Sequence, residues 1–272
     1  SNSYNSTTCS CGVYLQAGSG DHFFEDGWYE YSRNFAGLPD METIAKTAIE
    51  RTTRLIGAKK VETQKVPVIM EPSMSARLLG FLSQCIYGRS IYMKNSFLVD
   101  KLNTKIATDK LTVIDDPFIP GATGSRPFDS EGVPTRKSTI VDNGVLKSYL
   151  LDTYSAKKLN MKSTGHASGT ANFYIKAGNV NPADMIKSID KGLLLTRTIG
   201  QGTNPVTGDI STGAFGLWIE KGEIVFPVAE ITISGNLGQM LNEIEMIGND
   251  LKFNRATTAP TLKIKEMTVS GV

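Results

Sequence analysis

Residues 207–251, TGDISTGAFGLWIEKGEIVFPVAEITISGNLGQMLNEIEMIGNDL, carry the most regular pattern in this chain of 272 residues. The apolar and aromatic run 215–219 is typical of a half-buried strand, and residues 224–233 form a second such run. The polar segment 220–223 between them predicts a tight turn, because Gly222 adopts positive φ without steric cost. We therefore expect an antiparallel hairpin, in which Pro227 requires an edge or a bulge because it cannot donate a ladder hydrogen bond.

A helix is expected directly after this hairpin. Gly235 should end the second strand, and Asn236 is suited to the helix N-cap, since its side chain accepts from N–H groups in the first turn. The Gly-Asn-Asp segment 248–250 should close the helix. Between these signals, apolar residues follow at helical spacing at Leu237, Met240, Leu241, Ile244 and Ile247.

Elsewhere short strands and short helices are mixed along the chain. The Asp-Asn-Gly triplet 142–144 is the strongest further hairpin signal, within 138–152. Other strands are expected at 66–70, 111–115, 172–176, 193–198 and 261–269, and helices at 40–56, 73–86, 154–159 and 181–192. The predicted fold class is α+β, with mostly antiparallel hairpins that form a sheet or a barrel-like core and scattered helices.

Composition narrows the classes of function. A net charge of +2 and a pI near 8.3, with dispersed basic residues, argue against direct nucleic-acid binding. No apolar run reaches the length of a membrane span. Cys9, Cys11 and Cys85 do not form a disulfide framework, so we expect free thiols in a cytoplasmic protein, with a Cys-x-Cys metal site as the alternative. The polar opening SNSYNSTT, which lacks an initial Met, indicates a fragment of a longer chain.

Candidate catalytic residues are sparse. The two histidines, His22 and His166, are far apart and lack a neighbouring acidic cluster, so a self-contained zinc site is not predicted. His166 lies in a Ser/Gly-rich loop and is expected to be solvated. The segment 121–126, GATGSR, lacks the Lys-Ser/Thr pair of a phosphate-binding loop, and we interpret it as a structural loop held by Arg126.

Several short motifs, taken in order, resemble the C-terminal region of the PmbA/TldD family. Family members share the patterns G-x-x-I-E-x-G-E, P-V, S-G-N-L and I-G-N-D, which correspond here to residues 216–223, 227–228, 234–237 and 247–250. The T-G-D-I-S stretch 207–211 and the segments 124–129 and 131–136 are also similar. The resemblance covers roughly residues 65–270. It implies two regions: the end of an N-terminal region with a connecting helix (1–64), and a central and C-terminal domain (65–272).

The resemblance also bears on the branch of the family. TldD-like members carry a His-Glu-x-x-x-His helix and a cysteine near the C-terminus, which together bind zinc. The corresponding degenerate positions here are Gly80, Phe81 and Cys85, and no cysteine follows Asp250. The chain is therefore similar to the metal-free PmbA (TldE) branch, which implies no catalytic residue, metal or cofactor of its own. Whether it is an enzyme stays open at this point.

The function implied is that of a non-catalytic subunit of a TldD/TldE-type metalloprotease complex that cleaves unfolded or extended peptides. Its partner would be a TldD-like zinc metalloprotease subunit, with a homodimer when the chain is alone. The alternatives are an independent metal-free hydrolase that uses Asp209 or Ser211, and a regulatory protein acting on DNA gyrase or toxin–antitoxin systems. The candidate peptide-cavity or turn residues are Asp209, Ser211, Asn236, Asn249 and Asp250.

Overall fold

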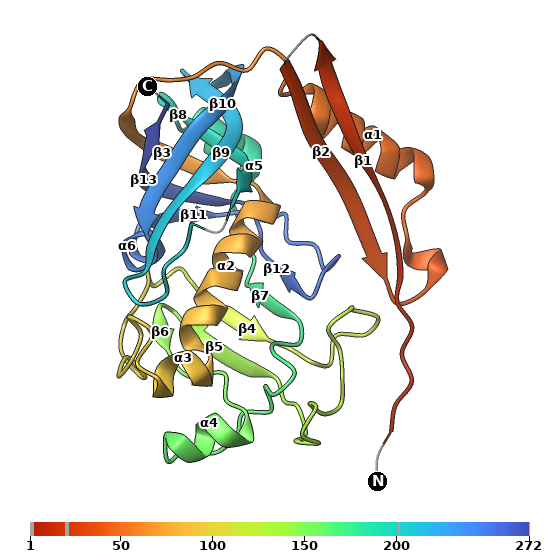
Figure 1. Ribbon diagram of the computed structural model, residues 1–272, viewed down its shortest axis with the longest axis vertical. Helices are drawn as coiled ribbons and strands as arrows, with labels where there is room; N and C mark the ends of the chain where they lie inside the picture. The colour runs from red at the N-terminus through yellow and green to blue at the C-terminus, as the bar shows by residue number, and fades with distance from the viewer. Residues whose placement is uncertain (1–2, 20–21, 201, 272) are drawn as a thin grey trace.

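A small closed barrel forms the upper half of the molecule (Figure 1). The computed structural model describes residues 3–19, 22–200 and 202–271. The strand order is β10-β9-β8-β3-β13-β11, and an additional pairing between β10 and β13 closes five of these strands into the barrel. Only the β3–β8 pair in this sheet is parallel. The strands are β3 (Gln64–Met70), β8 (Lys191–Ile199), β9 (Asp209–Glu220), β10 (Glu223–Asn236), β11 (Ile244–Ile247) and β13 (Leu262–Ser270).

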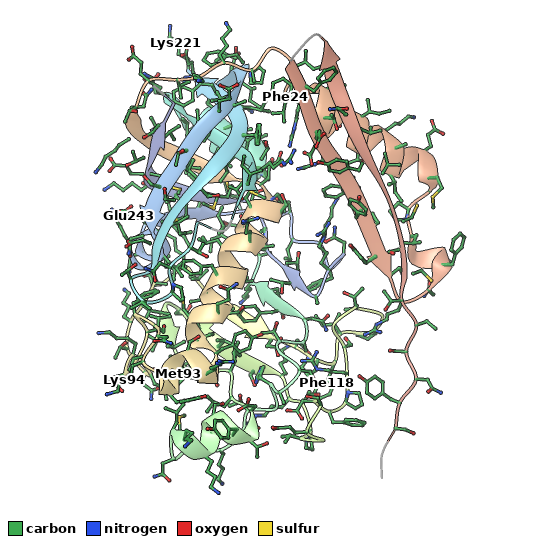
Figure 2. All side chains as sticks on the ribbon, in the orientation of Figure 1. Phe24, Met93, Lys94, Phe118, Lys221 and Glu243 are labelled. Atoms are coloured by element: carbon green, nitrogen blue, oxygen red, sulfur yellow. The ribbon has the colours of Figure 1, made fainter. Side chains whose placement is uncertain are left out.

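The hairpin predicted from the sequence is β9–β10. Its turn residues Lys221 and Gly222 have φ values of 51° and 80°, as a two-residue hairpin turn with positive φ at both positions requires. Lys221 is labelled at this end of the barrel in Figure 2. Pro227 lies between two register shifts of β10, which confirms the expected bulge. Gly235 does not end the strand, because β10 continues to Asn236, which pairs with Asp209.

The helix predicted up to Ile247 is shorter than expected. Helix α6 (Leu237–Asn242) ends after six residues, and β11 follows instead of a second half of the helix. Ile244 and Ile247 pair with Ile264 and Leu262 of β13, so tertiary pairing outweighs the helical spacing of the apolar residues. The segment 248–250 therefore follows a strand and does not close a helix.

A second, five-stranded sheet lies below the barrel in Figure 1. Its order is β12-β7-β4-β5-β6, and the predicted Asn143-Gly144 turn joins β5 to β6 with φ values of 45° and 80°. Its strands are β4 (Val113–Asp115), β5 (Ser138–Asp142), β6 (Val145–Leu146), β7 (Phe173–Ile175) and β12 (Thr257–Thr258). The short helices α3 (Gly88–Tyr92) and α4 (Thr153–Lys158) lie at this end of the molecule, whereas α5 (Pro182–Lys187) lies beside the barrel (Figure 1).

Helix α2 (Pro72–Ile86) runs from the barrel to the second sheet (Figure 1). Its buried side chains belong to one hydrophobic cluster that also includes residues of both sheets, so α2 joins them into a common core. None of the helices in the described ranges has the length and apolar content of a membrane span. The predicted α+β class with a barrel-like core and scattered helices is confirmed.

An N-terminal unit stands beside the barrel and α2 (Figure 1). It consists of the two-stranded sheet of β1 (Cys9–Ser19) and β2 (His22–Ser32), followed by a short 3-10 helix (Phe35–Gly37) and α1 (Met41–Thr53). Asp40 caps α1, because its Oδ1 accepts from the backbone N–H of Thr43 at 2.8 Å.

Candidate functional site

A groove of about 460 Å³ lies between strand β2, the first half of α2 and the segment 254–258. We call it the α2 groove. Trp28 of β2 contributes one side, Ala76 and Arg77 of α2 another, and Asn254 and Arg255 a third. Figure 1 shows the elements that form it: the β1–β2 hairpin, the upper part of α2, and the chain leading into β12.

The outward face of α2 forms one wall of the groove. Residues three or four apart on a helix lie on the same face, so Gly80 follows Ala76 and Arg77 one turn further along. A Cβ atom added at Gly80 would meet no heavy atom within 4 Å, so this position borders open space. Phe81 and Cys85 are instead buried, with 4% and 0% exposure. The structure therefore does not bring the three degenerate metal positions to one face.

These residues do not fit the zinc that the TldD-like helix implies. Gly80 and Phe81 carry no donor atom, and burial raises the pKa of the Cys85 thiol to about 12. Because a cysteine binds metal as the thiolate, Cys85 is a poor ligand at neutral pH. Within the described ranges, no group of three His, Cys, Asp or Glu side chains is placed to hold a metal ion. Cys9, Cys11 and Cys85 are free thiols, as predicted.

Strand β2 presents backbone groups to the groove. The carbonyl of Tyr29 accepts a hydrogen bond from the Arg255 guanidinium at 3.4 Å, so it points away from β1. The N–H of Gly27 is bonded to the Asp26 carboxylate at 2.8 Å and not to β1. In the described part of the chain no strand other than β1 pairs with β2. The second edge of β2 therefore has no strand partner in the described residues, and the side chains of Arg255 and Asp26 bond two of its backbone groups.

A cluster of four charged side chains holds Trp28 and the end of the groove in place. Arg51 of α1 lies 3.1 Å from the carboxylates of both Asp26 and Glu71, and Arg54 lies 2.6 Å from Glu71. The Arg51 guanidinium also lies 5.3 Å from the centroid of the Trp28 ring. Two positive and two negative groups balance, so the cluster links the N-terminal unit to the start of α2 without net charge.

Asp209 and Asn236 come together at the start of β9, while Ser211 lies apart on the same strand. The Asn236 amide donates to the Thr207 carbonyl at 2.8 Å and to the Asp209 carboxylate at 2.9 Å. Hydrogen bonds from Thr207 and Asn236 lower the pKa of Asp209. The Asn236 Oδ1 accepts from Gly238 N at 3.1 Å, which confirms the predicted cap of α6. Ser211 is exposed and pairs across the strand with Ser234.

Asn249 and Asp250 lie in the connection between β11 and β13. The Asp250 carboxylate accepts from the backbone N–H of Thr261 at 2.9 Å and from its hydroxyl at 2.7 Å. Asn249 is exposed, and its backbone N–H donates to the carbonyl of Val180 at 3.0 Å. These contacts stabilise the loop, so the geometry of this pair is that of turn residues.

His166 is not the solvated loop residue that the sequence indicates. It is 5% exposed, its Nε2 lies 3.1 Å from Asp115 Oδ2, and its Nδ1 lies 2.8 Å from Thr164 Oγ1. The side chain of His22 lies outside the described part of the structure. The segment 121–126 is a structural loop as predicted, because the Arg126 guanidinium donates to the carbonyl of Gly169.

The groove residues Trp28, Arg77 and Arg255 were not among the candidates from the sequence. Arg77 and Arg255 are separated by most of the chain, and no local motif marks either of them. The sequence signal for Trp28 is the aromatic and acidic stretch 21–37, which favours a core or interface strand, with a substrate-stacking role as the alternative.

Comparison with known proteins identifies the family. Residues 63–271 match the family described as the PmbA/TldA metallopeptidase C-terminal domain. The metalloprotease PmbA of Escherichia coli O157:H7 is 37% identical over 268 residues, which cover 98% of this chain and 60% of that protein. A metalloprotease TldD homologue of Buchnera aphidicola is 28% identical over 206 residues, which cover 65% of this chain and 42% of that protein.

Solved structures agree with the sequence relatives. A Bacteroides thetaiotaomicron protein, provisionally described as a modulator of DNA gyrase, matches with a TM-score of 0.90 at 36% identity, over 97% of this chain and 60% of that one. TldE from Thermococcus kodakarensis matches with a TM-score of 0.84 at 25% identity, over 97% of this chain and 63% of that one. The chain thus spans about 60% of the length of the curated relatives named PmbA. It belongs to the PmbA/TldD family.

Proposed function

We propose that this chain is the metal-free, non-catalytic subunit of a TldD/TldE-type metalloprotease. The feature that supports the proposal is α2: by the family resemblance, its Gly80, Phe81 and buried Cys85 correspond to the positions of the zinc-binding helix, and they do not form a set of metal ligands. The identity of 37% to a relative named PmbA, against 28% to one named TldD, supports the same branch. A TldD-like partner supplies the zinc ligands and the glutamate that activates a metal-bound water.

The α2 groove contributes to the wall of the cavity that encloses the peptide. An unfolded peptide binds most simply in an extended conformation, by adding a strand to a free sheet edge. Strand β2 has an edge without a strand partner along the groove, where a peptide N–H would replace the Arg255 side chain at the outward carbonyl of Tyr29. Main-chain hydrogen bonds do not depend on side chains, so this geometry suits a protein that accepts many sequences.

The free thiols are consistent with a reducing compartment, and we place the complex in the cytoplasm. Cys9, Cys11 and Cys85 are all unpaired, as is usual for cytosolic proteins. Without a TldD-like partner, the chain is expected to form a homodimer or to remain alone without peptidase activity.

The test is to purify the chain alone and together with a TldD-like subunit, and to measure bound zinc and hydrolysis of an unfolded peptide for each sample. We expect zinc and activity only in the mixture, and activity should be lost when the motif glutamate of the partner is replaced by glutamine. Peptide hydrolysis by the isolated chain that a chelator abolishes would overturn the proposal. Hydrolysis by the isolated chain that resists chelators but is lost in Ser211→Ala would instead establish the metal-free hydrolase.

A further inference from the structure

The α2 groove contains two arginines and no acidic side chain among the described residues that line it. The Arg77 guanidinium donates to the carbonyl of Gly200, and Arg255 donates to that of Tyr29 and lies 5.4 Å from the centroid of the Tyr31 ring. In the described ranges neither arginine has a carboxylate within ion-pair distance.

The arginines of the neighbouring charged cluster differ from those of the groove, because they have carboxylate partners. Arg51 and Arg54 are matched there by Asp26 and Glu71, so their charge is balanced inside the protein. The charges in the groove are not balanced in this way. Each guanidinium has five N–H donors in a planar fork, and the hydrogen bonds among the described residues use one nitrogen of Arg77 and one of Arg255. Such forks bind carboxylates with two parallel hydrogen bonds.

A small apolar hollow of about 40 Å³ adjoins the groove. Met74 and Arg77 line both spaces, so the hollow and the groove meet at this turn of α2. Other methionines, Met70, Met240 and Met267, form much of its lining. Methionine side chains are flexible and polarisable, and they accommodate apolar groups of different shapes.

We propose that the α2 groove selects extended peptides in which an acidic side chain neighbours an apolar one. The carboxylate binds Arg77 or Arg255, the apolar side chain enters the methionine-lined hollow, and the peptide backbone pairs with the edge of β2. The proposal rests on the peptide-wall role given above and adds the substrate class. The β2 edge supplies affinity for any extended chain, while the two arginines and the hollow supply the preference.

The preference is measured with the 272-residue chain by fluorescence anisotropy of labelled peptides of equal length. Four peptides are compared. The first contains an acidic residue next to an apolar one, and the second, the amide version, has Asn and Gln in place of Asp and Glu. The third and fourth are these two peptides with the apolar residue replaced by Ser. We expect the acidic, apolar peptide to bind about tenfold more tightly than its amide version, as charge-assisted hydrogen bonds imply. The advantage should shrink at high salt.

Two variants assign the preference to the groove. Arg77→Gln and Arg255→Gln should each reduce the acid-over-amide binding ratio, because they weaken binding of the acidic peptide more than binding of the amide peptide. Arg77→Gln leaves the contact between Arg255 and the hairpin intact, so a folding defect in Arg255→Gln does not remove the test. Arg136→Gln is the matched control, since it removes the same charge from an exposed arginine outside the groove.

The outcomes separate this inference from the proposed function. Equal binding of the acidic and amide peptides, or an unchanged ratio in Arg77→Gln, overturns the acidic preference and leaves the peptide-wall role intact. Failure of all four peptides to bind overturns both. A ratio that falls equally in Arg136→Gln would show a general charge effect and also overturn the assignment to the groove.

Discussion

Asn236 joins three segments of the barrel through a single side chain. Its amide donates to the carbonyl of Thr207 and to the carboxylate of Asp209, and its Oδ1 accepts from the first turn of α6. The same residue is the last of β10. One short side chain therefore fixes where the strand ends, where the helix begins, and how the preceding loop is held.

We expect Asn236→Ala to lower the free energy of unfolding by about 1–2 kcal/mol, because a helix cap and two further hydrogen bonds are lost. Urea denaturation measures the change. Asn249→Ala is the control, since Asn249 is an exposed asparagine in the other Gly-Asn pair, and a surface change of this kind should stay within about 0.5 kcal/mol. Equal losses in the two variants would contradict the structural role of Asn236.

The same variant has a consequence for pH dependence. Hydrogen bonds from Thr207 and Asn236 hold the pKa of Asp209 below its ordinary value. The folded-state pKa is lowered, so this contribution to stability is present above the ordinary Asp pKa of about 3.9 and is lost as pH falls through the folded-state value. The stability difference between the wild type and Asn236→Ala should therefore narrow below about pH 4.

At the residue scale, the local sequence predicted the helix cap but did not predict contacts between residues that are far apart in the chain. Asn236 could be predicted because a cap acts within its own turn. His166 could not, since its partner Asp115 is 51 residues away. Arg77 and Arg255 line one groove only because α2 and the segment before β12 border it in the folded chain. A single sequence contains no local signal that two such distant residues line one groove.

Two glycines show what a turn requires at the scale of an element. Gly132 and Gly144 both have positive φ, at 77° and 80°. A Cβ at Gly132 would meet nothing within 4 Å, whereas at Gly144 it would lie 2.3 Å from the carbonyl oxygen of Ala107. The first turn therefore needs glycine only for its backbone conformation. The second also needs it for close packing of the β5–β6 hairpin.

Gly132→Ala should lower the free energy of unfolding by about 1–2 kcal/mol, the cost of a left-handed conformation with a Cβ atom. Gly144→Ala should cost about 2–5 kcal/mol, because overpacking adds to the same backbone strain. Denaturant titrations of the two variants give the difference directly. Losses of similar size would show that the Gly144 turn is loosely packed, contrary to the contacts in the structure.

The sequence predicted the elements whose structure depends on residues within the element itself. It did not predict the element whose structure depends on pairing with a distant strand. The β9–β10 hairpin and the β5–β6 turn follow from glycine and asparagine at fixed positions. Residues 244–247 fit a helical pattern, yet they pair with β13 as a strand. Spacing alone cannot separate these outcomes, because the partner strand lies more than a dozen residues later in the chain.

At the scale of the whole molecule, the N-terminal unit is attached through Asp26, Arg51, Arg54 and Glu71. Glu71 accepts hydrogen bonds from Arg51 at 3.1 Å and from Arg54 at 2.6 and 3.0 Å. It directly precedes α2, so it connects the groove wall to the unit that carries Trp28. The geometry of the α2 groove therefore depends on this cluster.

Glu71→Ala should lower the free energy of unfolding by about 2–4 kcal/mol, because the largely buried guanidinium groups of Arg51 and Arg54 lose their shared carboxylate partner. The cost stays below that of a fully buried pair, since both guanidinium groups retain some exposure to solvent. The β1–β2 hairpin and α1 should also become more accessible, which hydrogen exchange of their amides would detect as faster than in the wild type. The loosened hairpin should weaken peptide binding in the groove as well.

The control is Glu42→Ala, which removes an exposed carboxylate from the same helix that carries Arg51. Its ion pair with Lys46, at 2.7 Å, has side chains that are 74% and 73% exposed, so we expect a loss within about 0.5 kcal/mol and no change in exchange. If Glu71→Ala were as mild as Glu42→Ala, the cluster would not be what attaches the N-terminal unit. The groove would then depend on other contacts of the unit, such as the hydrogen bond from Arg255 to the Tyr29 carbonyl and those from Arg33 to the carbonyls of Ala122 and Ser125.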